Sequence, residues 1–438
     1  MLRFFARRSS RRCGALLSGA VTLGRILAGS GLLGVAHASG FVLYDQSAAA
    51  LAQGSAVVGN VSEPAANWFN PAGLAFAPAA AGSATLSLAI ANTRFAPPSG
   101  TLVRSDLAPQ VVPNAFVSLP VSARATLGLG VFAPYGFAVN WPSAWAGREK
   151  AISVRVAVVA ANLNFAWRFS DRLAGAVGVA PLYGRVAFAV GLPASVGSRG
   201  DLEGSDWDWQ ANAAVMWKLA PNRLHLGAAY RGLNTGGRSR LGLEGEANFT
   251  VTSASLAETF ADQRARATLP LPDLASLGAT FFPSRHWQVG LQIDYTRWSV
   301  FDRLEVTFER PTTPRQIIER RSRDAASLRA GASFSGWRPG IELRAGLTFE
   351  QTTGRKESLA PSAPDGDRVG VSVGVGLMRQ RYRVDFGYLL LALLPAEAAG
   401  GLEGPAGTYT TLAHVLGLTV TGVVTAPSPP AGSGSDAR

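Results

Sequence analysis

The stretch WDWQANAAVMWKL (residues 207–219) alternates apolar and polar side chains over most of its length. Because successive side chains of a β-strand point to opposite faces, this period of two predicts a strand with one apolar and one polar face. Trp207 and Trp217 share the apolar face. At about 3.3 Å per residue and a tilt of about 40°, their spacing projects to roughly 25 Å, the height of the apolar band of a transmembrane barrel with an aromatic girdle at each edge. The stretch therefore predicts a strand that crosses an outer membrane.

The same alternation recurs along the chain, for example in WQVGLQIDYT (287–296) and IELRAGLTFE (341–350). Short and long connections between such segments alternate, as in bacterial barrels whose short turns face the periplasm. A closed barrel also leaves no strand edge in lipid, where an unsatisfied backbone group is costly. We predict an all-β, antiparallel transmembrane barrel of fourteen strands, near residues 82–95, 111–120, 124–135, 150–169, 172–190, 205–219, 222–233, 273–283, 286–301, 324–335, 339–351, 367–378, 381–393 and 410–424.

The first 38 residues have the features of a Sec signal peptide. They combine basic residues with an apolar run at 26–36, too short to span a bilayer, and an A-x-A cleavage pattern at 36–38. Without residues 1–38 the chain loses its only cysteine, Cys13, and keeps 35 of its 41 basic residues against 29 acidic ones. The exported chain therefore has no disulfide and is only weakly basic, which argues against a nucleic-acid partner.

The segment before the first predicted strand is apolar and rich in Gly and Pro. Within it, NWFNPAGLAF (67–76) places Trp68 and Phe69 directly before an Asn-Pro turn. About forty residues rarely form a core alone, and a barrel of this size has a lumen wide enough to need a plug. The predicted organisation is a signal peptide (1–38), a hatch or plug inside the lumen (39–81), a transmembrane barrel (82–425) and a disordered tail (426–438).

Three blocks of the chain resemble the FadL family of outer-membrane transporters for long-chain fatty acids and hydrocarbons (OMPP1/FadL/TodX). The first resembles the family's amino-terminal hatch, with an Asn-Pro-Ala box at 70–72; it reads SGFVLYDQSAAALAQGSAVVGNVSEPAANWFNPAGLAF (39–76). The second and third resemble a central and a late strand pair; they are LPDLASLGATFFPSRHWQVGLQIDYTRWSVFDRLEV (271–306) and APDGDRVGVSVGVGLMRQRYRVDFGYLLL (363–391). The blocks follow in the family's order along the mature chain. The last strand departs from the usual pattern, because GLTVTGVV runs into a Pro/Ser/Gly tail instead of ending on an aromatic residue.

The resemblance implies a transport path for apolar molecules. A ligand would be captured between outer loops, pass to an inner site beside the hatch, and leave sideways through a gap at a kinked third strand. Apolar walls suit this task, since each buried methylene contributes about 0.8 kcal/mol. The implied substrate-binding residues are Phe41, Val42 and Leu43 at the inner site, Arg185 for a carboxylate head group, and Leu256 and Phe260 in an outer groove. The implied hatch and gating residues are Trp68, Phe69, Asn70, Pro71 and Ala72, with Gly128 and Gly130 as the kink.

Each of these residues also has a purely structural interpretation. Residues 41–43 could simply pack within the plug, and Leu256 and Phe260 could pack one face of a small loop helix. Arg185 could join a salt bridge in the lumen. Glycines in a strand often serve close packing instead of a kink. The sequence leaves these alternatives open.

Other classes of function are weighed against the same residues. An outer-membrane enzyme would need a catalytic arrangement, but the mature chain has three histidines, none in a recognisable motif: His225, His286 and His414. We predict no catalytic residue, no metal site and no cofactor. The alternatives are a general diffusion porin, which would lack the apolar plug, and a hydrocarbon-specific channel. The predicted partners are hydrophobic small molecules, outer-membrane lipid and lipopolysaccharide, with the protein as a monomer in the outer membrane.

Overall fold

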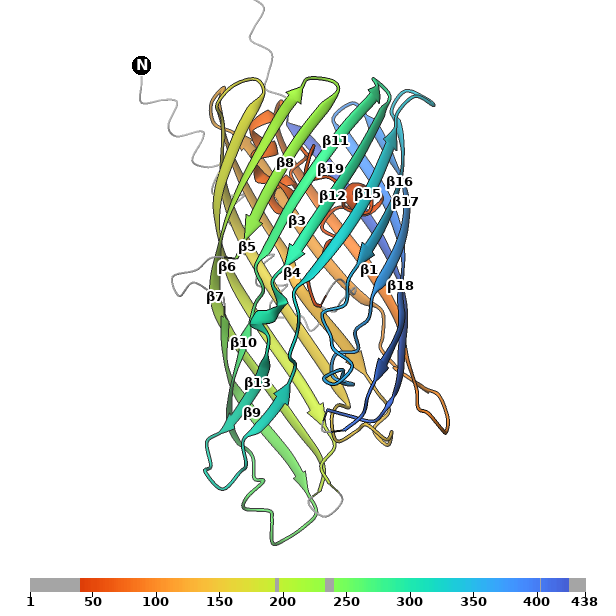
Figure 1. The fold of residues 1–438 in the computed structure, drawn as a ribbon. Coiled ribbons are helices and arrows are strands. Elements are labelled where there is room, and N and C mark those ends of the chain that lie inside the picture. The colour runs from red at the N-terminus through yellow and green to blue at the C-terminus, as the bar shows by residue number, and fades with distance from the viewer. Residues whose placement is uncertain (1–39, 194–196, 233–239, 402, 425–438) are drawn as a thin grey trace, which may run out of the picture.

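The computed structural model describes residues 40–193, 197–232, 240–401 and 403–424. They form nineteen strands in one sheet, which closes where β1 pairs with β19 (Figure 1). Fourteen of the strands succeed one another around the wall, so the predicted all-β barrel is confirmed. They are β1 (Ala80–Ala96), β3 (Gln110–Pro120), β4 (Ala125–Asn140), β5 (Ser153–Arg168), β6 (Leu173–Val190), β7 (Gly197–Ala220), β8 (Leu224–Arg231), β11 (Leu274–Ser284), β12 (Trp287–Thr296), β15 (Ala325–Phe334), β16 (Ile341–Glu350), β17 (Arg368–Arg379), β18 (Tyr382–Ala398) and β19 (Gly407–Val424).

The predicted signal peptide and carboxy-terminal tail lie outside the described residues. Within the described part of the chain, no helix is long and apolar enough to cross a membrane. The short turns gather at the upper end of Figure 1 and the long connections at the lower end. Asn222 and Gln380 have positive φ values of 59° and 55° in two of these tight turns. Asn tolerates this left-handed conformation better than most residues do.

Additional strands extend the wall beyond the barrel on one side. We call the group β9 (Arg240–Val251), β10 (Gln263–Pro270), β13 (Arg303–Phe308) and β14 (Gln316–Glu319) the extension. It arises because β7 is long enough to pair twice, with β9 through its first half and with β8 through its second. A two-residue strand, β2 (Val103–Arg104), pairs with β1. The connection between the predicted strands at 222–233 and 273–283 therefore contains two strands, β9 and β10, that were not predicted.

The outer face of the barrel is apolar. The large exposed side chains on the strands are mainly Leu, Val and Phe, for example Leu277, Leu291 and Leu347. Trp207 and Trp217 are both exposed, as their predicted place in two aromatic girdles requires. The Trp207 ring also packs on that of Tyr183, with centroids 5.0 Å apart.

The inner face carries buried ion pairs on the strands from β12 to β18. Arg329 binds Asp294 at 2.7 Å and Glu350 at 2.6 Å, and Arg344 binds Asp385 at 2.9 Å. Pairing stabilises these buried charges, because removing one partner would leave the other charge uncompensated. The polar-in, apolar-out pattern matches a lipid-embedded barrel.

The segment before β1, residues 40–79, lies inside the barrel (Figure 1) and is called the hatch segment. Its regular parts are short: α2 (Ala48–Leu51), α3 (Ala66–Phe69) and the 3-10 helix η1 (Pro71–Phe76). Its backbone approaches the wall where a row of neighbouring strands presents glycine. A Cβ there would overlap hatch backbone or side-chain atoms at each of Gly227, Gly278, Gly290, Gly331, Gly346, Gly374 and Gly387. The barrel thus provides a recess that fits the hatch segment.

Candidate ligand-binding site

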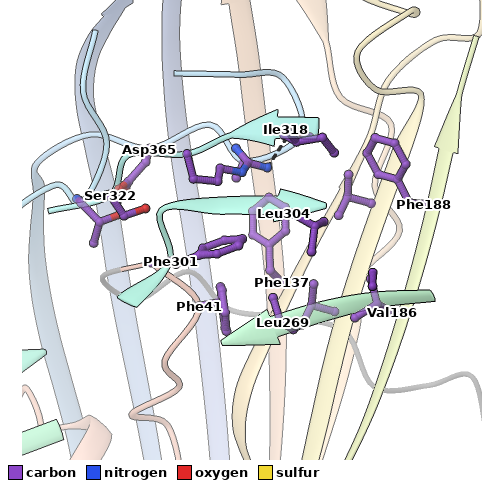
Figure 2. A pocket seen from close by; sticks show the side chains of 18 of the residues that line it. Phe41, Phe137, Val186, Phe188, Leu269, Phe301, Leu304, Ile318, Ser322 and Asp365 are labelled. Carbon is purple, nitrogen blue, oxygen red and sulfur yellow. Dashed lines mark hydrogen bonds between the residues drawn. The ribbon is translucent and has the colours of Figure 1, made fainter. Parts of the chain in front are cut away.

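A largely apolar cavity of about 140 Å³ lies between the hatch segment and the extension. Since an engineered cavity of about 150 Å³ binds benzene, this cavity has room for one aromatic ring or for part of an alkyl chain. A connection between β16 and β17, residues 352–366, covers part of it; we call it the strap. Figure 2 shows the apolar walls, with Phe137, Val186 and Phe188 from the barrel and Leu269, Leu304 and Ile318 from the extension.

Phe41 of the hatch segment, which the resemblance assigns to an inner ligand site, lies at the cavity. Its ring lies edge-on to Trp298 of the 3-10 helix η2 (Trp298–Val300), with centroids 4.4 Å apart. Tyr135 and Phe301 also contact it edge-on, at 6.1 and 6.2 Å. Such edge-to-face pairs fix ring orientation as well as burying area. Phe41 is therefore a rigid part of the cavity wall.

Arg320, in the connection between β14 and β15, is the polar feature of the cavity that sequence reasoning missed. Its Nη2 donates to Ser362 Oγ at 2.8 Å, and its guanidinium carbon lies 5.9 Å from the Phe301 ring centroid. No carboxylate among the described residues is within ion-pair distance of it, and its buried Nε has no hydrogen-bond partner there. Burial lowers the pKa of Arg320 to about 10, against the opposing influence of Glu403 and Asp365. The group nevertheless stays charged at neutral pH.

The other arginine at the cavity, Arg368, is ion-paired, although its buried Nε and Nη1 have no hydrogen-bond partner among the described residues. Arg368 binds Asp365, and its Nη1 lies 3.6 Å from Glu350. The contrast matters because an uncompensated buried cation favours an anionic ligand, whereas a paired one does not. Arg320 is therefore the candidate partner for an acidic group.

The third strand of the wall, β4, is interrupted. Its pairing with β3 spans only Thr126–Val131, and its register with β5 shifts between Phe132 and Tyr135. Beyond this point along β4, the hatch segment becomes the hydrogen-bonding partner. Leu43 N donates to Pro134 O at 2.9 Å, and Gly136 N donates to Phe41 O at 2.8 Å. The first hatch residues thus form a short antiparallel bridge on an edge of β4 that β3 leaves free.

The expected kink at Gly128 and Gly130 is wrong in position. Both residues pair regularly with β3 and β5. The irregularity lies at Pro134 instead, because proline has no N–H for the ladder. Gly128 has another role: a Cβ there would overlap Leu74 and Asn67 of the hatch segment.

The Asn-Pro-Ala box joins the hatch segment to the wall. Asn70 Oδ1 accepts from Ala72 N at 3.1 Å, and its Nδ2 donates to Val58 O at 2.8 Å and to Val215 O of β7 at 3.1 Å. Pro71 follows as the first residue of η1, a position that suits its fixed φ. A side chain larger than that of the fully buried Ala72 would not fit.

The two aromatic residues before the box are buried against the wall. The Trp68 ring lies 5.3 Å from that of Phe132 on β4, at the interruption, and the Arg231 guanidinium stacks 4.7 Å from Trp68. Phe69 is buried in the same core. Trp68 therefore connects the box to the irregular part of β4.

Other expected site residues lie away from the cavity. Val42 and Leu43 are fully buried against β4 and do not line it. Leu256 and Phe260 form one helical turn, in which Phe260 N donates to Leu256 O at 3.0 Å, and Phe260 packs on Phe249. The structure does not bring these two residues to Phe41.

Arg185 faces outward, which contradicts its expected place in the lumen. Its neighbours Val186 and Phe188 line the cavity, so the alternation of the strand puts Arg185 on the outer face. There it forms an ion pair with Glu203, and both side chains are about half exposed. Arg185 therefore cannot bind a ligand in this cavity.

We expect Phe41→Ala to weaken binding of a fluorescent fatty acid by about tenfold, because an enclosed apolar contact excludes water more fully than a loop surface does. Leu256→Ala, on the partly exposed turn, is the matched control and should change affinity by less than about threefold. Fluorescence titration of the purified proteins measures both. Equal losses in the two variants would remove Phe41 from the site.

Comparison with known proteins places the chain among outer-membrane barrels. The sequence model of one family, described as outer membrane protein transport protein (OMPP1/FadL/TodX), matches residues 31–421. The long-chain fatty acid transport protein of Escherichia coli K12 is 23% identical over 316 residues, 63% of this chain and 70% of that one. A Pseudomonas aeruginosa FadL homologue superposes with a TM-score of 0.78 at 20% identity, covering 88% of this chain and 99% of that one. The Pseudomonas putida toluene transporter TodX gives 0.72 at 18%, covering 88% and 100%.

Proposed function

This chain belongs to the outer membrane protein transport family (OMPP1/FadL/TodX), and on that premise we propose that it takes up hydrophobic carboxylic acids, long-chain fatty acids being the substrate class. It is an outer-membrane transport protein and not an enzyme. One observation carries the proposal: Arg320 is a cation without a carboxylate partner among the described residues, placed at an apolar cavity. A carboxylate on an alkyl chain complements both parts of such a site.

The remaining arginines of the lumen do not compete for this role. Arg329, Arg344 and Arg383 form ion pairs with strand carboxylates. Arg231 has no carboxylate within ion-pair distance among the described residues, but it donates to the Asn67 and Trp68 carbonyl oxygens of the hatch segment. The Arg231 charge therefore stabilises the carboxy-terminal end of α3, where carbonyl groups lack partners within the helix.

We further propose that the ligand leaves sideways, between β3 and β4. The middle of the hatch segment is held by barrel side chains: Thr419 Oγ1 accepts from Ala48 N at 2.8 Å, and Ser372 Oγ accepts from Gly54 N at 3.0 Å. The bridge of Phe41–Leu43 on β4 is short by comparison and adjoins the cavity. Release of that bridge would connect the cavity to the unpaired edge of β4. Exit through the wall therefore requires less rearrangement than expulsion of the whole plug.

The test compares a fluorescent long-chain acid with its methyl ester. We expect the wild-type protein to prefer the acid, and Arg320→Met to weaken acid binding by about tenfold or more while ester binding is unchanged, since a hydrogen bond to a charged group contributes roughly 1.5–3 kcal/mol. Arg303→Met, on the exposed outer face of β13, is the matched control. A wild-type protein that binds both probes equally, or an Arg320→Met variant that loses both, would contradict the proposal.

A monoaromatic hydrocarbon is the second candidate substrate. The cavity volume of about 140 Å³ favours it, because a ring fits without any change in the lining. The same titration distinguishes the two candidates. Toluene binding that is unaffected by Arg320→Met, together with no preference for the acid over the ester, would support the hydrocarbon.

A further inference from the structure

The strap over the cavity is closed at its base by its own residues. Asp365, at one end, accepts hydrogen bonds from Thr353 N at 2.8 Å and Thr353 Oγ1 at 2.7 Å, at the other end. Thr352 Oγ1 adds a third bond to the same carboxylate, at 3.1 Å. Asp365 also binds Arg368 at the start of β17. The base of the strap is therefore anchored to the barrel by contacts that do not involve Arg320.

The ends of the strap contact the barrel at several points, since Lys356 forms an ion pair with Glu397 at 2.6 Å and Ala399 N donates to Lys356 O at 3.0 Å. In the middle of the strap, residues 358–363, two of the three hydrogen bonds to the other described parts of the chain involve Arg320. Ser362 Oγ accepts from Arg320 Nη2 at 2.8 Å, and Ser358 Oγ donates to the Arg320 carbonyl oxygen at 2.6 Å. Trp141 Nε1 donates to Pro361 O at 3.0 Å. Both serines are buried at the cavity. The middle of the strap is thus tied to the residue proposed to bind the ligand.

The hydroxyl of Ser362 occupies half of the guanidinium edge that a carboxylate would use. Nε and Nη2 of an arginine form one planar fork that binds both oxygens of a carboxylate. In Arg320, Nη2 is donated to Ser362 while the buried Nε has no partner among the described residues. A carboxylate is the stronger acceptor and can use both donors. A carboxylate bound to this fork therefore competes with Ser362 for Nη2.

We infer that Ser362 is an internal competitor for the head-group position, and that an acidic ligand displaces it and lifts the middle of the strap from the cavity. The inference rests on the proposed function. The cavity volume supports it, because about 140 Å³ is less than a long acyl chain needs with the strap in place. A neutral ligand does not compete for Arg320, so Ser362 makes strap opening specific for acids.

The test uses the purified full barrel with the acid probe and its methyl ester. Ser362→Ala should raise acid affinity by about three- to tenfold, because in the protein without ligand Arg320 Nη2 then lacks the Ser362 acceptor that the acid has to displace. The affinity for the ester should be unchanged. Ser255→Ala, at an exposed serine that does not line the cavity, is the control. In the wild-type protein, amide exchange over 358–363 should become faster with the acid and not with the ester. An acid affinity that is unchanged or lower in Ser362→Ala overturns the inference. An amide exchange rate of the strap that is the same with and without the acid also overturns it.

The two proposals fail in distinguishable ways. If Arg320→Met abolishes the preference for acid but Ser362→Ala has no effect, Arg320 binds the head group and Ser362 is not its competitor. If Arg320→Met keeps the preference, the head-group assignment is wrong and the role of Ser362 is wrong with it.

Discussion

Gly346→Val should make the barrel conduct ions while the barrel itself still assembles. Gly346 lies on β16, and a Cβ there would overlap the backbone of Gln53 and Gly54 in the hatch segment. Overpacking of a tight interface costs about 1–3 kcal/mol or more, whereas valine suits the strand itself. The hatch segment cannot shift slightly to avoid the clash, because barrel side chains bind its backbone at Ala48, Gly54 and Val58. We therefore expect the hatch segment to leave its recess.

Single-channel recording in a planar bilayer measures this effect. The wild-type protein should show little steady current and Gly346→Val a large one, with heat-modifiable mobility confirming that both barrels are folded. Gly82→Val is the matched control: it also lies in a barrel strand, but the nearest atom to an added Cβ is 3.7 Å away. A silent Gly346→Val barrel with normal uptake would show that the hatch segment stays in its recess despite the added side chain, which would contradict the prediction.

The barrel could be predicted from the sequence because a lipid-facing strand has few solutions. Every second residue of such a strand must be apolar over the height of the bilayer, as between Trp207 and Trp217. Each short turn then connects the strand to an antiparallel neighbour. The same alternation is present in RLGLEGEANFTV (240–251), which forms β9. This strand was not among the fourteen predicted, because a barrel wall of the height of a bilayer does not require it. The strands of the extension were therefore not predicted from the sequence.

The candidate site was less accessible because its contacts join distant segments. Phe41 followed from a resemblance, whereas Arg320 and Ser362 lie in irregular connections, where no periodicity indicates which way a side chain points. Arg185 was misplaced for a physical reason. The rule that polar side chains face the lumen fails beside an apolar cavity, where Val186 and Phe188 occupy the inner face. A binding site of this kind inverts the pattern that identifies the barrel around it.

A disulfide between Cys substitutions at Val42 and Tyr135 should abolish uptake, and reduction should restore it. Val42 and Tyr135 are bridge partners on the hatch segment and β4, flanked by the two backbone hydrogen bonds of Phe41 and Leu43. This makes them a non-hydrogen-bonded antiparallel pair, whose Cα atoms are about 4.5 Å apart, within the range a disulfide spans. The only cysteine of the chain is Cys13, within the predicted signal peptide, so no other thiol of the exported protein competes.

The disulfide distinguishes ligand binding from ligand release. It holds the Phe41–Leu43 bridge closed on β4 and changes neither Arg320 nor the walls formed by the extension. Under oxidation we expect acid binding in detergent to persist within about threefold and uptake by cells to fall to background, since a constraint on position does not remove apolar contacts. The single Val42→Cys and Tyr135→Cys variants, treated identically, control for the loss of each side chain. If the oxidised double variant transports as well as its reduced form, the bridge does not have to open, and the ligand leaves the cavity by a route that does not pass the edge of β4.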